Sequence, residues 1–258
     1  MAMIRRWRSA IGGLRGAGRR TNVALLVVLI GAALTGVLAF AAGTPIPARL
    51  ATVAHGLLGL AVVLLVPWKS VIVRRAPALR LASLALVALI VVCIASGIVE
   101  VFGGYGVLWR LSPMQVHVGS AVLAAPLLAW HLLRHRRQRL RRRDLSRRTL
   151  LRTGVLAAGV AVTYATLEGI GRLAGSASAG RIATGSHYLS PDRVPATMWL
   201  FDRVPPLPAD YRIHVAGNEL AVADLAARST TLAARLDCTS GWFTDAEWTA
   251  VSVAELLC

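Results

Sequence analysis

Two histidines stand inside long apolar segments of this 258-residue chain, where ionisable side chains are rare. His55 and His117 lie in different segments, at similar depths of about 8 and 5 Å from the outer ends of the helices that the segments predict. Imidazoles from two helices at one level can ligate a haem iron from both sides. We therefore expect His55 and His117 to bind the iron of a haem b, with an interhelical hydrogen bond or a proton path as the alternative.

Small residues accompany both histidines. Gly56 and Gly59 follow His55, and Gly119 follows His117. Because glycine has no side chain, these positions would let a flat macrocycle approach the helices closely. The sequence therefore favours a haem that lies beside these three glycines.

The remaining histidines of the apolar part do not predict a second haem. His131 lies 14 residues after His117, which places it about 21 Å deeper on nearly the same helical face. The matching position of the other segment holds Lys69 instead of a histidine. We expect His131 and His135 to extend toward the cytoplasmic surface beside the neighbouring arginines.

Apolar segments dominate the chain, which is 56% hydrophobic and has a mean hydropathy of +0.61. About 20 apolar residues cross the roughly 30 Å hydrocarbon layer of a bilayer. A fifth, weaker run at 153–167, extended through 170, is either a further span or a signal-like segment. Four stronger runs approach the required length: 23–42, 50–66, 81–99 and 116–133. The expected fold class is an all-α bundle of four or five helices in a lipid bilayer.

The net charge of +17 is unevenly distributed along the chain. Residues 1–172 hold 23 basic and 3 acidic side chains, whereas residues 173–258 hold 6 and 9. The basic residues lie in short clusters between apolar runs, which argues against a nucleic-acid-binding domain. Basic loops stay in the cytoplasm under the positive-inside rule. We expect a multi-pass protein of the cell membrane whose C-terminal domain is extracytoplasmic.

An arginine pair precedes the fifth run, in the segment Ser146-Arg147-Arg148-Thr149-Leu150-Leu151-Arg152. A twin arginine before a moderately apolar stretch resembles the signal that exports folded proteins. The alternative is a chance pair in a loop that holds ten basic residues between Arg134 and Arg152. The resemblance implies that the region after the fifth run is exported.

The residues after the fifth run predict a mixed α/β domain. Alternating runs at 211–215 and 231–236 are typical of strands. Gly217 favours a turn, and Asp224 could cap a short helix. The last residues, 253–258, are apolar and helix-like, so we expect the sequence to stop within this domain.

The segment around Cys238 has a distinctive order of residues. A cysteine, a glycine and a tryptophan are followed by the pattern Trp-x-x-Val-x-Val-x-x-Leu-Leu, at Cys238, Gly241, Trp242 and 248–257. This order is similar to the molybdenum-ligating segment of the sulfite oxidase family, which includes bacterial protein-methionine-sulfoxide reductases. The stretches that resemble the opening strands of that family are 195–199, 202–205 and 211–217.

The resemblance implies that Cys238 is a catalytic residue that ligates molybdenum beside a molybdopterin. A soft thiolate suits such a metal, and Gly241 would permit the close approach of a bulky cofactor. Arg203 would also lie at the cofactor. The alternatives for Cys238 are a disulfide with Cys258 and an inert buried thiol. Sulfite is not the expected substrate, because 201–203 holds Phe-Asp-Arg where sulfite oxidases carry Arg-Asn-His.

The four-helix part with His55 and His117 looks like a b-type cytochrome of the cytochrome b561 or ferric reductase kind. Together the two resemblances divide the chain into four parts. These are a basic cytoplasmic N-terminus, a haem-binding four-helix domain, a basic linker with the arginine pair and the fifth apolar segment, and a partial molybdopterin-binding domain: 1–22, 23–134, 135–175 and 176–258.

These expectations describe a membrane-anchored, molybdopterin-dependent oxidoreductase that passes electrons between a b-type haem and an extracytoplasmic molybdenum site. A quinone or another redox partner would exchange electrons with the haem. The sequence lacks the latter half of the sulfite oxidase domain, so we expect that either it is a fragment or a completing chain supplies that half. One alternative is a non-enzymatic haem-binding electron carrier whose tail docks a partner, and another is a membrane scaffold without a cofactor.

Overall fold

The computed structural model describes residues 18–74, 81–107, 111–134, 147–195, 204–208, 210–215 and 217–257. Three residues with an expected role lie outside these ranges: His135, Arg203 and Cys258.

Five long helices form the first part of the described chain. Each contains a stretch of 22 to 25 residues that is long and apolar enough to cross a membrane. The fifth apolar run, which the sequence left open, belongs to the longest of these stretches. The helices are α2 (Arg19–Ala41), α3 (Pro45–Arg74), α4 (Leu81–Gly103), α5 (Pro113–Arg134) and α6 (Arg147–Leu173). Many of their Leu, Val and Ile side chains face outward, which suits a lipid environment. The protein is therefore a multi-pass membrane protein.

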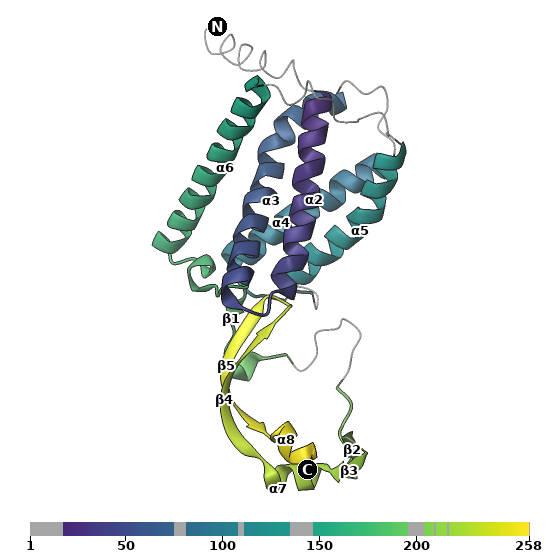
Figure 1. Ribbon diagram of the computed structural model, residues 1–258, viewed down its shortest axis with the longest axis vertical. Coiled ribbons are helices and arrows are strands. Elements are labelled where there is room, and N and C mark those ends of the chain that lie inside the picture. Colours follow the sequence, from purple (N-terminus) through teal and green to yellow (C-terminus); the bar gives the residue numbers. More distant parts are fainter. Residues whose placement is uncertain are drawn as a thin grey trace.

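The helices run in alternating directions, so their ends gather at two ends of a bundle (Figure 1). We call the end where α2, α4 and α6 finish the tail end, because the C-terminal region extends from it, and the opposite end the basic end. Two helices start earlier than the apolar runs suggest, at Pro45 and Pro113. Proline is favoured in the first turn of a helix, because the backbone N–H that it lacks would be unpaired there.

The helices pack as pairs. α2 lies along α3 and α4 along α5, while contacts between the two pairs are much weaker. An apolar core closes the bundle near the basic end, around Leu25, Val62 and Leu65, with partly buried side chains of α4 and α6 against it. α6 packs on α3, where the ring of Tyr164 lies against Gly56. The pairs are therefore joined by side chains at the basic end, and the histidines lie nearer the tail end.

The tail contains five strands, two short α-helices and two 3-10 helices, η3 (Ala177–Gly180) and η4 (Pro191–Arg193), in the described residues. Strand β5 (Trp242–Ala250) lies between β1 (His187–Tyr188), to which it is parallel, and β4 (Thr230–Cys238), to which it is antiparallel. β2 (Arg212–Val215) and β3 (Asn218–Ala221) form a separate hairpin. In Figure 1, β4 and β5 form a long curved ribbon that starts at the tail end of the bundle and carries α7 (Val222–Arg228) and α8 (Val253–Leu257) near its far end.

Most local predictions for the tail are confirmed. Strands occur at 212–215 and 230–238, and Gly217 has a φ of +85° in the turn between β2 and β3. The prediction that Asp224 caps a short helix is confirmed, although Asp224 is the third residue of the helix and not the residue before it. The helix starts at Val222, so Asp224 lies in its first turn, where its carboxylate accepts a hydrogen bond from the backbone N–H of Ala221 at 3.2 Å.

Candidate functional site

His55 and His117 lie next to each other between the two helix pairs. The centroids of their rings are 5.7 Å apart, and the ring planes are nearly perpendicular. His55 belongs to α3 and His117 to α5, and these helices have only weak contact with each other or none. The two imidazoles therefore meet where the helices that hold them have little or no direct contact with each other.

Backbone carbonyls orient both rings. The Nδ1 atom of His55 lies 2.8 Å from the carbonyl oxygen of Ala32, and that of His117 lies 2.7 Å from the carbonyl oxygen of Cys93. A carbonyl only accepts, so each Nδ1 must carry the hydrogen. In a neutral imidazole the lone pair then lies on Nε2, the arrangement that metal-ligating histidines adopt. Within the part of the chain that the structure describes, neither Nε2 has a hydrogen-bond partner.

Two glycines that the sequence analysis did not single out provide the space for the rings. A Cβ atom at Gly97 would lie 2.9 Å from Nδ1 of His117, and one at Gly36 would lie 3.2 Å from a ring carbon of His55. Each glycine follows the carbonyl acceptor by four residues on the same helix. The repeated pattern Ala-x-x-x-Gly in α2 and Cys-x-x-x-Gly in α4 is a signal that could have found both.

The glycines that were expected to border the haem have other surroundings. A Cβ atom at Gly56 would lie 2.8 Å from the ring of Tyr164, so this position accommodates α6 instead of a macrocycle. No other atoms lie within 4 Å of a Cβ atom placed at Gly59 or Gly119. The prediction for Gly56 is therefore wrong, because a neighbouring helix takes that space.

The depths of the histidines also differ from those expected. α3 begins at Pro45, ten residues before His55, and α5 begins at Pro113, four residues before His117. At 1.5 Å per residue these separations are roughly 15 and 6 Å. The rings still meet, because α3 extends further toward the tail than its apolar run indicates.

The residues present are compatible with a haem that has two histidine ligands after a small separation of the rings. Two metal–nitrogen bonds of about 2 Å each, together with the radii of both rings, span slightly more than the 5.7 Å between the centroids, which now lie edge to face. Both rings present an unpartnered Nε2, and they belong to helix pairs that make few contacts with each other. A haem between the pairs would have its iron held by His55 and His117.

The residues that argued against a second haem lie away from the histidine pair. His131 is in the last turn of α5, at the basic end. The ammonium group of Lys69 donates a hydrogen bond to the side-chain oxygen of Asn22 at 3.0 Å, which links α3 to α2. Neither residue joins the His55–His117 pair.

Cys238 is the last residue of β4, at a tight turn that faces the tail end of the bundle. Its thiol is half-buried and forms no disulfide among the described residues. The backbone N–H of Gly241 donates to the carbonyl of Cys238 at 3.1 Å, and Gly241 has a φ of +93°. A Cβ atom at Gly241 would overlap the carboxyl group of Glu100. The space that was expected to admit a cofactor at Gly241 is therefore occupied by the bundle.

The turn after Cys238 forms a buried junction with the bundle. Trp242, Glu100 and His187 have 2%, 4% and 4% of their surface exposed. Ser112 donates a hydrogen bond across the junction to the carbonyl of Ser240 at 3.5 Å. Burial is the main cause that lowers the pKa of His187, so its imidazole is neutral at neutral pH. The tail thus meets the membrane domain through a packed interface.

An ion pair lies at one side of this junction. The guanidinium group of Arg181 donates to the carboxylate of Glu168 in α6 at 2.5 Å, and both side chains are largely buried. Arg181 also donates to the carbonyl of Ser178 at 3.3 Å. These bonds connect α6 to the chain that enters β1.

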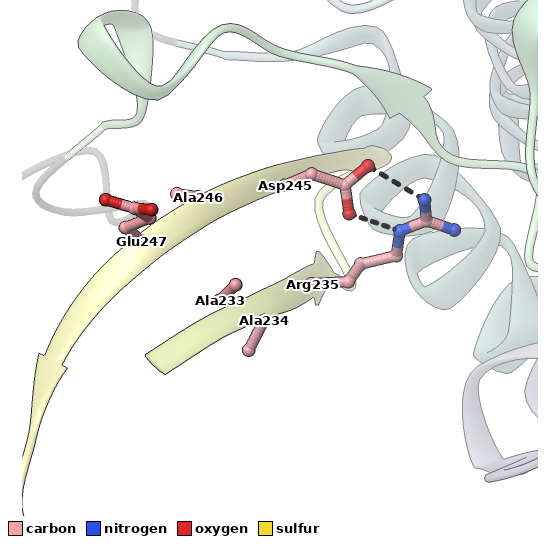
Figure 2. Close-up of a pocket in the computed structure, with 6 residues that line it drawn as sticks. All are labelled: Ala233, Ala234, Arg235, Asp245, Ala246 and Glu247. Atoms are coloured by element: carbon pink, nitrogen blue, oxygen red, sulfur yellow. Dashed lines mark hydrogen bonds and ion pairs between the residues drawn. The ribbon is translucent and has the colours of Figure 1, made fainter. Parts of the chain in front are cut away.

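The outer part of the ribbon is exposed and has different chemistry. Figure 2 shows a shallow depression between β4 and β5, lined by small alanine side chains and bridged by Arg235 and Asp245. The guanidinium group donates two hydrogen bonds to the carboxylate, at 2.7 and 2.8 Å. None of the expected site residues lies in this depression. In the described ranges, no group of three or more His, Cys, Asp or Glu side chains is placed to hold a metal ion.

Comparisons with protein-family models, curated proteins and solved structures find no match for this chain. Its function must therefore be argued from its own residues. The two candidate groups of ligands, the His55–His117 pair and the thiol of Cys238, lie in the bundle and in the tail, on the two sides of the buried junction.

Proposed function

We propose that this protein is a membrane-bound redox protein, in which a haem b ligated by His55 and His117 exchanges electrons with a molybdenum site at Cys238. One observation carries the haem part of the proposal. Two imidazoles from different helix pairs lie 5.7 Å apart, and hydrogen bonds from Nδ1 leave both Nε2 atoms free to ligate a metal. A simple interhelical hydrogen bond between the rings would instead occupy an Nε2 atom.

The bound haem would supply one-electron chemistry inside the membrane. The chain's own residues would determine its orientation and environment. The carbonyls of Ala32 and Cys93 hold the two rings, while Gly36 and Gly97 allow them to lie close to the neighbouring helices. Apolar helices around the site exclude water, so charge changes at the iron are weakly screened.

A continuous series of contacts leads from the histidine pair to Cys238. The ring of His117 lies against Gly97, and Glu100 follows Gly97 by three residues, on the same face of α4. Glu100 faces Gly241, whose N–H bonds to the carbonyl of Cys238. This series supports the proposal that electrons pass between the haem and a centre at Cys238.

Molybdenum at Cys238 is supported by the chemistry of the residue and by the resemblance of its segment to the sulfite oxidase family. The thiol is accessible, free of a disulfide in the described chain and close to the bundle. A thiolate suits a soft, sulfur-rich metal centre. The molybdopterin itself would need further residues, which we assign to a completing chain.

The haem proposal is tested by absorbance spectroscopy of the purified full chain in detergent. We expect a reducible haem b band that is lost in His55→Ala and in His117→Ala. His131→Ala is the matched control, because it removes a histidine of α5 at the basic end and should keep the band. Loss of haem only in His131→Ala would contradict the assignment.

The molybdenum proposal is tested by metal analysis. The 258-residue chain should contain haem but little molybdenum, whereas the chain supplied with a completing partner should contain both. In that context Cys238→Ser should lose molybdenum and keep haem. Stoichiometric molybdenum in Cys238→Ser would refute the ligand assignment.

A haem-binding electron carrier without catalysis is the second candidate, and one observation favours it. In the described tail from Val204 onward, the buried residues are confined to 240–244, so the outer ribbon has no core of its own. Such an exposed ribbon could bind a separate redox protein. Metal analysis that finds haem but no molybdenum in the chain, even when a completing partner is supplied, would support this candidate.

A further inference from the structure

Five buried polar atoms at the junction have no hydrogen-bond partner among the described residues. They are the two carboxyl oxygens of Glu100, the Nε2 atom of His187, the indole nitrogen of Trp242 and the hydroxyl oxygen of Thr244. His187 and Trp242 are paired residues on the neighbouring strands β1 and β5. Unpaired polar atoms are rare inside proteins, and a group of them at one place points to a function. No step of the proposed electron exchange described above uses Glu100 or His187 chemically.

Glu100 and His187 lie at a distance that suits a shared proton. Oε1 of Glu100 is 4.0 Å from Nε2 of His187, slightly too far for a direct hydrogen bond. A small movement or one water molecule would connect them. If the pair held no proton, an unpaired carboxylate would be buried in the junction, which is strongly unfavourable. The pair is therefore poised to take a proton when further negative charge is added nearby.

We propose that Glu100 and His187 together hold one exchangeable proton, which the pair takes up when an electron is added at the His55–His117 centre and releases when the electron leaves. This inference rests on the proposed haem function. The electron would come from a membrane quinol or another one-electron donor, and a quinol that is oxidised releases its own hydroxyl protons to water. The haem would accept the electron. The proton on the pair would come from a hydronium ion in the water on the side of the tail, so that one O–H bond of hydronium breaks and an O–H or N–H bond forms on the pair.

The position of Glu100 explains why this pair responds to the haem. It follows Gly97, which touches the ring of His117, by three residues on α4. In surroundings of low dielectric constant, an added negative charge acts strongly on a group one helical turn away. A proton taken up at Glu100 or His187 compensates that charge.

The other charged or titratable groups that face Glu100 are less suited to this role. Arg181 is already paired with Glu168. Burial, and to a smaller extent Cys238 and Glu100, raise the pKa of Tyr105, which therefore stays protonated at neutral pH. His117 and Cys238 face the site from α5 and β4, and both are assigned to metal ligation. The Glu100–His187 pair remains as the group that exchanges a proton.

The first test does not depend on haem. Infrared spectra of the full chain in lipid nanodiscs, recorded between pH 5 and 9 (a range of about two units around neutrality), should contain a titrating carboxyl band. We expect Glu100→Gln to lose this band and His187→Gln to move its midpoint. Glu247→Gln is the control, because it removes an exposed carboxyl of the outer ribbon, away from the junction.

The second test measures the haem midpoint potential against pH, with dithionite as the reductant. Proton uptake on reduction requires the potential to fall as pH rises. We expect this slope in the parent and in Glu247→Gln, and a flat profile in Glu100→Gln. His187→Gln leaves the carboxyl of Glu100 in place, so its midpoint potential should still fall with rising pH, but over a different pH range. This variant therefore separates loss of the exchangeable proton from general damage to the junction.

Each result decides between the alternatives. A carboxyl band that persists in Glu100→Gln, or a potential that keeps its slope in that variant, would overturn the proposal. If the chain binds no haem, the proposed function fails, while the infrared titration still shows whether Glu100 exchanges a proton. A parent protein without a titrating carboxyl band would overturn the inference even if haem is bound.

Discussion

The membrane bundle and the tail organise their candidate chemistry in opposite ways. In the bundle, the candidate ligands His55 and His117 are held by backbone carbonyls and by glycines on neighbouring helices. In the tail, the candidate ligand Cys238 stands at the end of an exposed two-stranded ribbon. The bundle therefore supplies a complete pair of ligands from one chain, whereas the tail supplies a single one.

The location of buried residues extends this contrast. The buried part of the ribbon is confined to 240–244, where it meets the bundle. A two-stranded ribbon is marginally stable in water unless it packs against something else. The comparison teaches that the tail has its firmest structure where it touches the membrane domain, beside Cys238. The predictions below test whether the two regions differ in this way.

The largest expected effect concerns the export of the tail across the membrane, which the bundle does not need for its own insertion. Replacing Arg147 and Arg148 with lysines should abolish export of the tail, while hydropathy still inserts the upstream helices. Protease added to intact spheroplasts should cut the tail of the parent and spare that of the variant. The control replaces Arg142 and Arg143, another arginine pair of the same loop, with lysines and should behave like the parent. Equal cleavage of all three proteins would show that the twin arginine has no export role.

The second prediction tests how closely the bundle holds its histidines. Gly97→Ala places a Cβ atom 2.9 Å from Nδ1 of His117, and Gly36→Ala places one at 3.2 Å from the ring of His55. A displaced ring would lose its hydrogen bond to the backbone carbonyl. Loss of a hydrogen bond that orients a metal ligand typically weakens metal binding about 10-fold or more, and we expect haem binding to weaken by a similar factor. The effect should be larger for Gly97→Ala than for Gly36→Ala.

A matched control for these variants is Gly159→Ala in α6, where a Cβ atom would meet no other atom within 4 Å. Haem titration followed by absorbance should give the parent affinity for this variant. If all three alanine variants bind haem equally well, close packing against the rings is not required.

The sequence predicts the bundle well because its signals are local. A run of about 20 apolar residues predicts a span by itself, and all five runs lie in helices. The sequence also identifies His55 and His117 as the pair to consider. It does not identify Gly36 and Gly97, because their role depends on which helices become neighbours.

The junction could not be predicted from sequence for a related reason. Glu100 lies at the end of an apolar run, and Gly241 follows it by 141 positions. Nothing local indicates that the two meet, so Gly241 was interpreted as a space for a cofactor. His187 and Trp242 likewise become neighbours only through the parallel pairing of β1 with β5. Contacts between distant segments thus account for what the sequence analysis missed.

The third prediction compares two glycines of the tail. Gly241 and Gly217 both have positive φ, at +93° and +85°. Alanine at either should cost about 1–2 kcal/mol of local backbone strain. Gly241→Ala must also displace Glu100, whereas a Cβ atom at Gly217 meets no other atom within 4 Å. Limited proteolysis of the full chain should therefore cut the tail faster in Gly241→Ala than in Gly217→Ala. Equal rates would mean that the junction does not stabilise the tail.

The smallest effect is expected at the Arg235–Asp245 pair of the outer ribbon. Its two hydrogen bonds lower the pKa of the Asp245 carboxyl. A lowered folded-state pKa stabilises the fold above the ordinary carboxyl pKa, and this stabilisation is lost as the pH falls through the folded value. Both groups are exposed, so water and salt screen the pair and little stability is at stake.

Asp245→Asn should therefore leave the melting temperature of the tail at neutral pH almost unchanged, and added salt should reduce even that difference. The guanidinium group of Arg235 also lies 4.8 Å from the centre of the Phe243 ring, at the border of the junction. Arg235→Ala should then have a slightly larger effect than Asp245→Asn, because it removes packing against a buried ring as well as charge. Calorimetry of both variants at two salt concentrations separates the loss of charge, which depends on salt, from the loss of packing, which does not. A large loss of stability in Asp245→Asn would mean that the outer ribbon has a stabilising core, and that the contrast between the two regions is wrong.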